Sequence, residues 1–438
     1  GWSEPEPLTS LNEQGNVNYP FLMSDASLFA ASVSSLTLMG HSGEGFISGI
    51  AVFNYNVGAI FVIIFVSLFF LPFYIKSGIY TIPEYLGRRF DNRSRKYFSF
   101  ITIIGNVFLD AGAALYTGAL ILKIIFPEID MMWIIIGMAL MAGTYTIIGG
   151  LSSAINADMI QSIILIAGSV LLSIFCFNSV GGWENFVEHF HDGVWLNLIR
   201  PNSDTTVPWF SIFLSIPILG FYFWGNNQVI VQRVMSAKTV NEGRLGFLFV
   251  AFLYVFTLFI FIAPGMVGRM IDLFGVGDTL PNEIIDGNTL RAQYGIDTNE
   301  VYPRLILKLL PVGLIGVMIA CMVSALTSTL SATLSSVSTL FTMDFYKSWR
   351  PESSPRHLVR VGQWTSFIAL VVAVLWAPLI GKFASLVAYY QEFSSYLAPP
   401  IVGTFLVGLF WKAPSARHPI QWMVSAVISG ILFSTLHS

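Results

Sequence analysis

The sequence predicts an all-α polytopic membrane protein with about eleven transmembrane helices, on three observations. Of its 438 residues, 55% are hydrophobic and 11% are charged, whereas soluble domains carry about 25% charged residues. Apolar stretches of about 20 residues recur along the whole chain, and this is the length a helix needs to cross a bilayer core of about 30 Å. These stretches lack the residue-by-residue alternation of membrane β-barrels.

Hydropathy windows locate the individual helices in chain order. Each window is a continuous apolar run, and the charged residues fall mostly in the connections between windows. The expected helices comprise residues 25–50, 51–75, 97–126, 131–149, 154–179, 208–231, 244–271, 303–346, 356–379, 383–411 and 419–436.

Charged residues in the connections predict the orientation, because short loops rich in Lys and Arg remain in the cytoplasm. The loops expected there carry Arg88, Arg89, Arg93 and Arg95 within Lys76–Lys96, then Arg233, Lys238 and Arg244, then Lys347, Arg350, Arg356 and Arg360, then Lys412 and Arg417. The loops expected outside are acidic, with Glu184, Glu188, Asp192 and Asp204, and later Asp278, Glu283, Asp286, Asp297 and Glu300.

Two blocks of five helices, residues 25–179 and 208–411, would have opposite topology, followed by an additional C-terminal transmembrane helix at 419–436. This is the inverted-repeat plan of secondary transporters. Both blocks open with polar or glycine-rich segments, which membrane helices tolerate only against protein or a wet cavity. These segments are Ser32, Ser34, Ser35 and Thr37 leading into Gly40, Gly43 and Gly45, and later Trp224-Gly225-Asn226-Asn227-Gln228.

Four strings resemble the sodium/solute symporter family, most closely its bacterial sodium/galactose members. They are GIYTIPEYLGRRF (Gly78 to Phe90), WGNNQVIVQR (Trp224 to Arg233), LFTMDFYK (Leu340 to Lys347) and YYQEF (Tyr389 to Phe393). The resemblance implies a leucine-transporter-type 5+5 inverted-repeat fold and alternating access. It also implies a sodium-coupled symporter of the cell (plasma) membrane that imports a small polar solute, most simply a monosaccharide or polyol.

The resemblance further implies a main sodium site. Its ligands would be the backbone carbonyls of Ala30, Val33 and Ala325 and the hydroxyls of Ser328 and Thr329. A hard cation takes several oxygen ligands, and all five positions can supply one. A plainer explanation of these hydroxyls is that Ser and Thr in membrane helices often bond back to their own backbone or join helices.

A second sodium site, found in some relatives, would use Asp158 and Ser331. Ala332 stands where those relatives have a hydroxyl, so this site departs from the pattern. Asp158 alone is equally explained as a helix cap or a structural hydrogen-bonding group.

The solute is expected among the first, second, third, sixth and tenth helices. Asp110 lies in the middle of an apolar span, where an ionisable residue is a functional hypothesis by default. It suits a hydroxyl or amine of the solute and argues against an anion. Aromatic faces and amides suit sugars, and the candidate contacts are Ser32, Ser34, Thr37, Tyr55, Asn56, Asp110, Tyr222, Trp224, Asn227 and Gln391.

Several of these positions depart from the galactose contacts of the family. Ser32, Thr37 and Asn56 stand where the galactose transporter has an asparagine, a glutamine and a glutamate, whereas Tyr55 and Gln391 are retained. The changes keep neutral hydrogen-bonding groups but count against galactose itself. We expect His41 and Glu44 to be vestibule or gate residues rather than ligands.

Other functions fit less well. A membrane enzyme needs clustered histidines, cysteines or carboxylates, and a channel needs a pore loop or an oligomeric ring; neither pattern is present. The net charge of −3 gives no reason to expect nucleic acid, so the expected partners are the solute, sodium ions and the lipid bilayer. A symporter for a carboxylate or an amino-sugar acid, and a sodium-dependent solute sensor, remain the alternatives.

Overall fold

The computed structural model describes residues 35–77, 81–191, 193–204, 206–235, 239–276, 280, 284–383 and 385–410. These residues form helices and connecting loops, with a single isolated β-bridge between Arg200 and Pro208. The all-α prediction is therefore confirmed. The predicted C-terminal helix 419–436 and the opening of the first helix lie outside the described residues.

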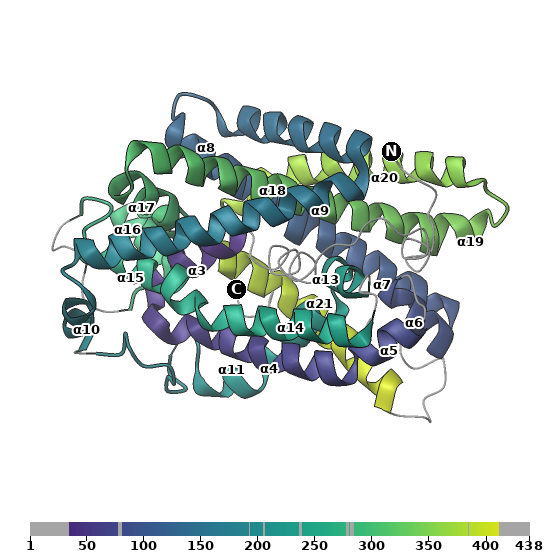
Figure 1. Cartoon of the computed structure of the whole chain (residues 1–438), viewed down its shortest axis with the longest axis horizontal. Coiled ribbons are helices and arrows are strands. Elements are labelled where there is room, and N and C mark those ends of the chain that lie inside the picture. Colours follow the sequence, from purple (N-terminus) through teal and green to yellow (C-terminus); the bar gives the residue numbers. More distant parts are fainter. Residues whose placement is uncertain are drawn as a thin grey trace.

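The first block consists of long helices joined by short connections, and Figure 1 shows them packed roughly parallel or antiparallel to one another. Two short segments, η1 and η2, are a 3-10 turn and a π-helical stretch. The elements of the first block are α3 (Ser35–Ser48), η1 (Gly49–Val52), α4 (Phe53–Phe69), α5 (Leu71–Ser77), α6 (Ile82–Arg89), α7 (Asn92–Gly105), η2 (Asn106–Gly112), α8 (Ala113–Ile125) and α9 (Met131–Ser179).

A glycine corner ends the first helix and positions the second. Gly49 has φ +69°, and a Cβ there would lie 2.4 Å from the carbonyl oxygen of Trp195, so only glycine fits this corner. The backbone N–H of Ile50 donates to the same carbonyl at 3.0 Å. The buried Arg200 donates to the carbonyl of Ser48 at 2.7 Å. The loop that follows α10 (Trp183–His191) therefore holds the end of the first helix in place.

The third helix begins earlier than hydropathy predicts, at Asn92 rather than residue 97. Asp91 explains the difference, because its carboxylate accepts a hydrogen bond from the N–H of Ser94 at 2.7 Å and caps the helix. The first turn of α7 is polar and capped by Asp91, so the helix begins before the apolar residues that hydropathy detects.

The fourth and fifth expected helices, 131–149 and 154–179, belong to one uninterrupted helical run, α9. Figure 1 shows the α9 ribbon turning back on itself between its two arms. A non-helical connection was expected between residues 149 and 154, but these residues are helical as well.

The second block has more interruptions than the first. Its elements are α11 (Trp209–Phe213), α12 (Ser215–Phe221), η3 (Tyr222–Asn226), α13 (Gln228–Met235), α14 (Val240–Val255), η4 (Leu258–Ile262), α15 (Ala263–Met270), α16 (Gly287–Tyr294), η6 (Thr298–Glu300), α17 (Val301–Leu309), α18 (Val312–Leu340), η7 (Phe341–Tyr346), α19 (Lys347–Trp349), α20 (Pro355–Ile380) and α21 (Leu386–Phe410).

The sixth helix is interrupted within the polar string that opens the second block. Asn227 is extended, with φ −71° and ψ 119°, between the π-helical η3 and α13. The eighth helix was predicted as one element, 303–346, and this is wrong. Leu310 is extended before Pro311, which separates α17 from α18, because a residue before proline avoids the helical region.

Five described helices are long and apolar enough to cross a membrane, and two bent pairs could raise that number to seven. Large apolar side chains such as Phe61, Trp133, Phe213 and Trp364 are exposed on their outer surfaces. Such a surface suits lipid, because bilayer hydrocarbon is as apolar as the side chains themselves.

The two predicted cytoplasmic segments Lys76–Lys96 and Lys347–Arg360 meet at one end of the molecule. Figure 1 shows α6 and α19 at the same end, with α10 and α16 at the other. Arg95 of the first segment pairs with Asp344 of η7, which directly follows α18, with 2.5 Å between Arg95 Nη2 and Asp344 Oδ1. The arrangement agrees with the orientation derived from the basic loops.

Candidate solute cavity and sodium site

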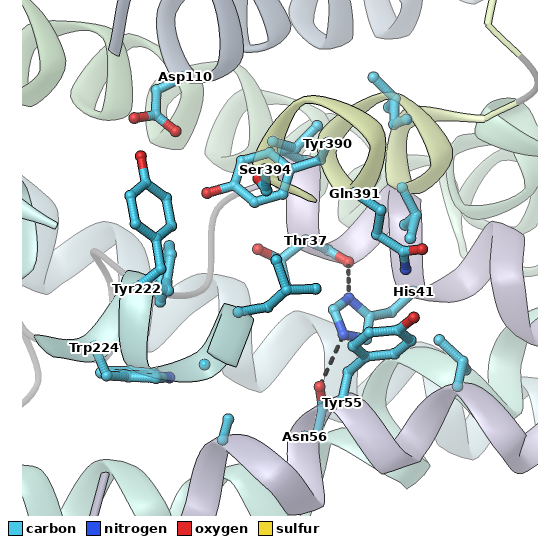
Figure 2. A pocket seen from close by; sticks show the side chains of 18 of the residues that line it. Thr37, His41, Tyr55, Asn56, Asp110, Tyr222, Trp224, Tyr390, Gln391 and Ser394 are labelled. Atoms are coloured by element: carbon cyan, nitrogen blue, oxygen red, sulfur yellow. Dashed lines mark hydrogen bonds between the residues drawn. The ribbon is translucent and has the colours of Figure 1, made fainter. Parts of the chain in front are cut away.

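A cavity of about 240 Å³ lies between α3, α4, η2, η3, α18 and α21. Most of the predicted solute contacts line it, and Figure 2 shows them converging from separate helices. The predicted residues that the structure brings together here are Thr37, Tyr55, Asn56, Asp110, Tyr222, Trp224 and Gln391. Ser32 and Ser34 lie outside the described residues.

Asn227 has a different place from the one predicted. It is buried but does not line the cavity. Its side-chain oxygen accepts a hydrogen bond from the N–H of Val229 at 2.9 Å. Asn227 therefore caps α13 after the break, because a short amide satisfies an otherwise unpaired N–H at a helix start.

His41, expected to be a vestibule or gate residue, lines the cavity itself. Its Nδ1 lies 2.9 Å from the carbonyl oxygen of Thr37, and its Nε2 lies 2.8 Å from Asn56 Oδ1. The Asn56 amide donates in turn to the Thr257 hydroxyl at 2.6 Å, and that hydroxyl donates to the Tyr254 carbonyl at 2.5 Å. This chain fixes which way the Asn56 amide points into the cavity.

We expect Thr257→Val to lower the free energy of unfolding by about 1 to 3 kcal/mol, because the buried Asn56 amide loses its acceptor. Apparent solute affinity should fall with it, since Asn56 is then free to turn. Thermal unfolding in detergent and solute titration of the same preparation measure both effects. Thr117→Val is the matched control, because the Thr117 hydroxyl donates only to its own helix at Ala113; an equal loss there would refute the role of the chain.

The tenth helix contributes more than the single predicted glutamine. Gln391 is a hydrogen-bond partner of the Tyr55 hydroxyl on α4, and Tyr390 lies one helical turn before Ser394 on α21. Tyr390 and Ser394 also line the cavity and were missed. Ser394 follows Gln391 by three residues and Tyr390 by four, and this helical spacing places Ser394 on a shared face with each of them.

Glu44 does not line the cavity. Its carboxylate accepts a hydrogen bond from the Ser385 hydroxyl at 2.8 Å, which joins α3 to the start of α21. The contact agrees with the expected position of Glu44 beyond the solute contacts.

Asp110 is presented to the cavity by the π-helical η2. The wider turn changes the backbone pairing, and the Tyr389 hydroxyl donates to the carbonyl of Phe108 at 2.8 Å. Tyr389 itself accepts from the Trp376 indole at 2.8 Å. The position of η2 is thus held from α20 and α21, as expected of π-bulges at functional sites.

The described part of the predicted sodium site is on α18. Ala325, Ser328 and Thr329 are three and four residues apart and therefore share one face of the helix. The Thr329 hydroxyl donates to the Ala325 carbonyl at 3.0 Å, which leaves the lone pairs of the hydroxyl oxygen for a cation. Thr329 also lines the solute cavity. The other two predicted ligands, Ala30 and Val33, lie outside the described residues.

Back-bonding alone does not identify an ion site on α18. Thr327 and Thr339 make the same contact with carbonyls one turn earlier, at 2.9 Å each. For the second predicted site, Ser331 is buried, whereas the side chain of Asp158 lies outside the described residues.

Known proteins resemble this chain over nearly its whole length. The profile described as the sodium:solute symporter family matches residues 19–417. The sodium/glucose cotransporter of Vibrio parahaemolyticus is 32% identical over 423 residues, which cover 93% of this chain and 76% of that protein. The sodium/myo-inositol cotransporter 2 of Mus musculus is 32% identical over 426 residues, covering 93% and 63%.

The fold also matches a solved structure, a substrate-bound outward-open state of a Na⁺-coupled sialic acid symporter. The TM-score is 0.74 at 22% identity, with 96% of this chain and 90% of that chain covered. At this identity the likeness concerns the fold and confirms the predicted architecture. The chain spans 62% to 65% of the length of the mammalian relatives it matches.

Proposed function

This chain belongs to the sodium:solute symporter family and is a multi-pass membrane protein, and we propose that it imports a small polar solute together with sodium across the plasma membrane. The solute is a monosaccharide or polyol, and the cycle is alternating access. The named activities of the sodium/glucose and sodium/myo-inositol cotransporters support this class of solute.

The observation that carries the proposal is the lining of the cavity. Thr37, Asn56, Gln391 and Ser394 offer neutral donors and acceptors from three helices, and Trp224 and Tyr390 offer aromatic faces. Hydroxyl-rich solutes need both, because their rims form hydrogen bonds and their ring faces are apolar.

Coupling follows from the position of Thr329, which lines the cavity and shares a helix face with Ser328. We assign the sodium ligands to Ala30, Val33, Ala325, Ser328 and Thr329, with sodium as a transported ion. Occupying this shell joins the first helix to α18 while solute is bound next to it. Sodium then shifts the protein toward the outward-facing state, which captures solute. The size of this shift is limited to the difference in sodium affinity between the outward and inward states.

For this cycle we propose that residues 25–179 and residues 208–411 form two inverted repeats, and that 419–436 is an additional transmembrane helix. The interrupted sixth helix, broken at Asn227, supports this plan, since discontinuous helices form the midplane sites of such transporters. The common end of Lys76–Lys96 and Lys347–Arg360 supports it as well.

A carboxylate or an amino-sugar acid is the weaker candidate solute. Asp110 would repel an anion in the cavity, and none of the described lining residues is a lysine or arginine. A sodium-dependent sensor differs from a transporter only in that bound solute does not cross the membrane.

Uptake into proteoliposomes tests the function. Radiolabelled glucose and myo-inositol should accumulate inside when sodium is higher outside, and equal sodium or potassium in its place should abolish accumulation. Sodium-dependent binding without accumulation would indicate a sensor. Accumulation of a carboxylate but of neither probe would refute the proposed solute class.

We expect Asn56→Ala and Gln391→Ala to weaken apparent solute affinity by about 1 to 3 kcal/mol each, because each removal leaves a cavity partner unpaired. Half-maximal solute concentration, measured at saturating sodium, should rise accordingly. Glu44→Gln is the control, since Glu44 contacts Ser385 and not the cavity. Unchanged uptake in both alanine variants would remove these residues from the solute site.

A further inference from the structure

The described lining of the solute cavity has one acidic group and no strong base. Asp110 is the one carboxylate among the described residues that line it, and no lysine or arginine lines it. His41 is the remaining basic side chain there, and its ring nitrogens lie against the Thr37 carbonyl and the Asn56 side chain rather than against Asp110.

No cation of the described chain neutralises Asp110. The ion pairs of the described residues join other acids, such as Asp344 with Arg95 and Asp297 with Arg291. Asp110 makes no hydrogen bond to a described residue either. Residues 1–34, which lie outside the described residues, contain no Lys, Arg or His. An ionised carboxylate at this depth is costly unless a ligand pairs with it.

The carboxylate is aimed at the space a solute would occupy. Figure 2 shows the Asp110 carboxylate and the Tyr222 hydroxyl facing each other across one end of the cavity. The backbone that carries Asp110 is held by the bond from Tyr389 to the Phe108 carbonyl. The backbone of η2 that carries Asp110 is therefore tied to α21.

Aromatic rings form much of the remaining wall. The described lining includes six of them, Tyr55, Tyr222, Phe223, Trp224, Tyr254 and Tyr390. The face of an aromatic ring attracts a cation, and the attraction is strongest where water is excluded. One carboxylate among several rings, with hydroxyl and amide groups at the other end, is complementary to an ammonium group on a hydroxylated solute.

We propose that the solute carries an ammonium group that pairs with Asp110, so that the preferred substrates are amino sugars or amino polyols. The inference rests on the proposed function and narrows its solute class. The hydroxyls of the solute bind the Asn56 and Gln391 end of the cavity, while the charge of the ammonium group offsets that of Asp110.

Competition against sodium-dependent uptake tests the preference with matched probes. Glucosamine presents an ammonium group, N-acetylglucosamine presents the same ring with a neutral amide, and glucose presents a hydroxyl. Monosaccharides with the amine on other ring carbons complete the panel. In the unmodified protein, the best ammonium probe should bind at least about tenfold more tightly than its neutral counterpart.

Asp110→Asn should abolish that preference, measured as the ratio of the affinities for each ammonium probe and its neutral counterpart, and Asp110→Glu should keep it. Glu44→Gln is the matched acid control and should also keep it. Equal affinity for ammonium and neutral probes in the unmodified protein overturns the inference without any variant. A preference that survives in Asp110→Asn overturns it too, as does a variant whose sodium requirement changes while its solute selectivity does not.

The two proposals fail in different ways. Uptake of neutral sugars without an ammonium preference refutes this inference alone. Absence of sodium-driven uptake for every probe, charged or neutral, refutes the proposed function as well.

Discussion

Arg95→Gln is expected to destabilise the protein by about 3 to 5 kcal/mol, because it leaves a buried carboxylate without its cation. The side chain of Asp344 is fully buried, while a quarter of the Arg95 side chain is exposed. Arg95 donates two hydrogen bonds to Asp344 Oδ1, at 2.8 Å from Nε and 2.5 Å from Nη2. Ser99 donates to the other oxygen at 2.5 Å.

Because Asp344 is more deeply buried than Arg95, replacing one residue should not cost the same stability as replacing the other. Asp344→Asn leaves Arg95 able to reach water, so its cost should be smaller than that of Arg95→Gln. The double variant replaces the ion pair by two amides and should recover part of the loss, because the cycle isolates the interaction between the two side chains. Thermal unfolding of all four proteins in the same detergent provides the comparison.

A surface ion pair gives the control. Arg88 pairs with Glu84 at 2.6 Å, but half of the Arg88 side chain is exposed, and such pairs contribute about 0.3 to 0.5 kcal/mol. Arg88→Gln should therefore leave the unfolding temperature almost unchanged. A loss at Arg88 as large as that at Arg95, or additive single losses in the cycle, would contradict the role of the buried pair.

The sequence predicts most membrane helices because hydropathy averages over a whole span. That averaging also hides interruptions. Pro311 stands inside an apolar run, so window 303–346 appears continuous, although the proline itself signals a break. The interruption at Asn227 is easier to predict, since Trp224-Gly225-Asn226-Asn227-Gln228 is a polar string at membrane depth.

The cavity is predicted less completely than the helices. Family resemblance brings Asn56, Asp110 and Gln391 to one place, and the structure agrees. His41 is missed because its contact with Asn56 joins residues fifteen positions apart on two helices, which no helical period reveals. The π-helical turn that presents Asp110 depends on Tyr389, almost three hundred residues away, so the local sequence of η2 does not determine it.

Thr329→Val and Ser328→Ala are expected to raise the sodium concentration for half-maximal uptake by about tenfold or more, which corresponds to about 1.4 kcal/mol of lost ion affinity. Valine keeps the shape of threonine and removes the oxygen that a hard cation requires. Solute affinity measured at saturating sodium should change much less. The measurement is a sodium titration of uptake at fixed membrane potential.

Thr327 is the matched control for the sodium site. It lies on the same helix and donates to the carbonyl one turn earlier at 2.9 Å, just as Thr329 does, but it does not line the cavity. Thr327→Val should therefore leave sodium dependence within about twofold of the unmodified protein. If both back-bonded threonines behave alike, the hydroxyl at Thr329 is structural rather than a ligand.

The energetics of coupling set the consequence of weakening this site. Each unit charge that crosses 100 mV contributes about 2.3 kcal/mol, and this contribution reaches the solute only while sodium occupies its site. At low sodium concentration, the Thr329→Val variant should bind solute weakly and fail to accumulate it. Raising the sodium concentration should restore accumulation. If Ser328→Ala and Thr329→Val both keep the original sodium dependence, or if a proton gradient drives uptake equally well without sodium, these residues do not bind the coupling ion.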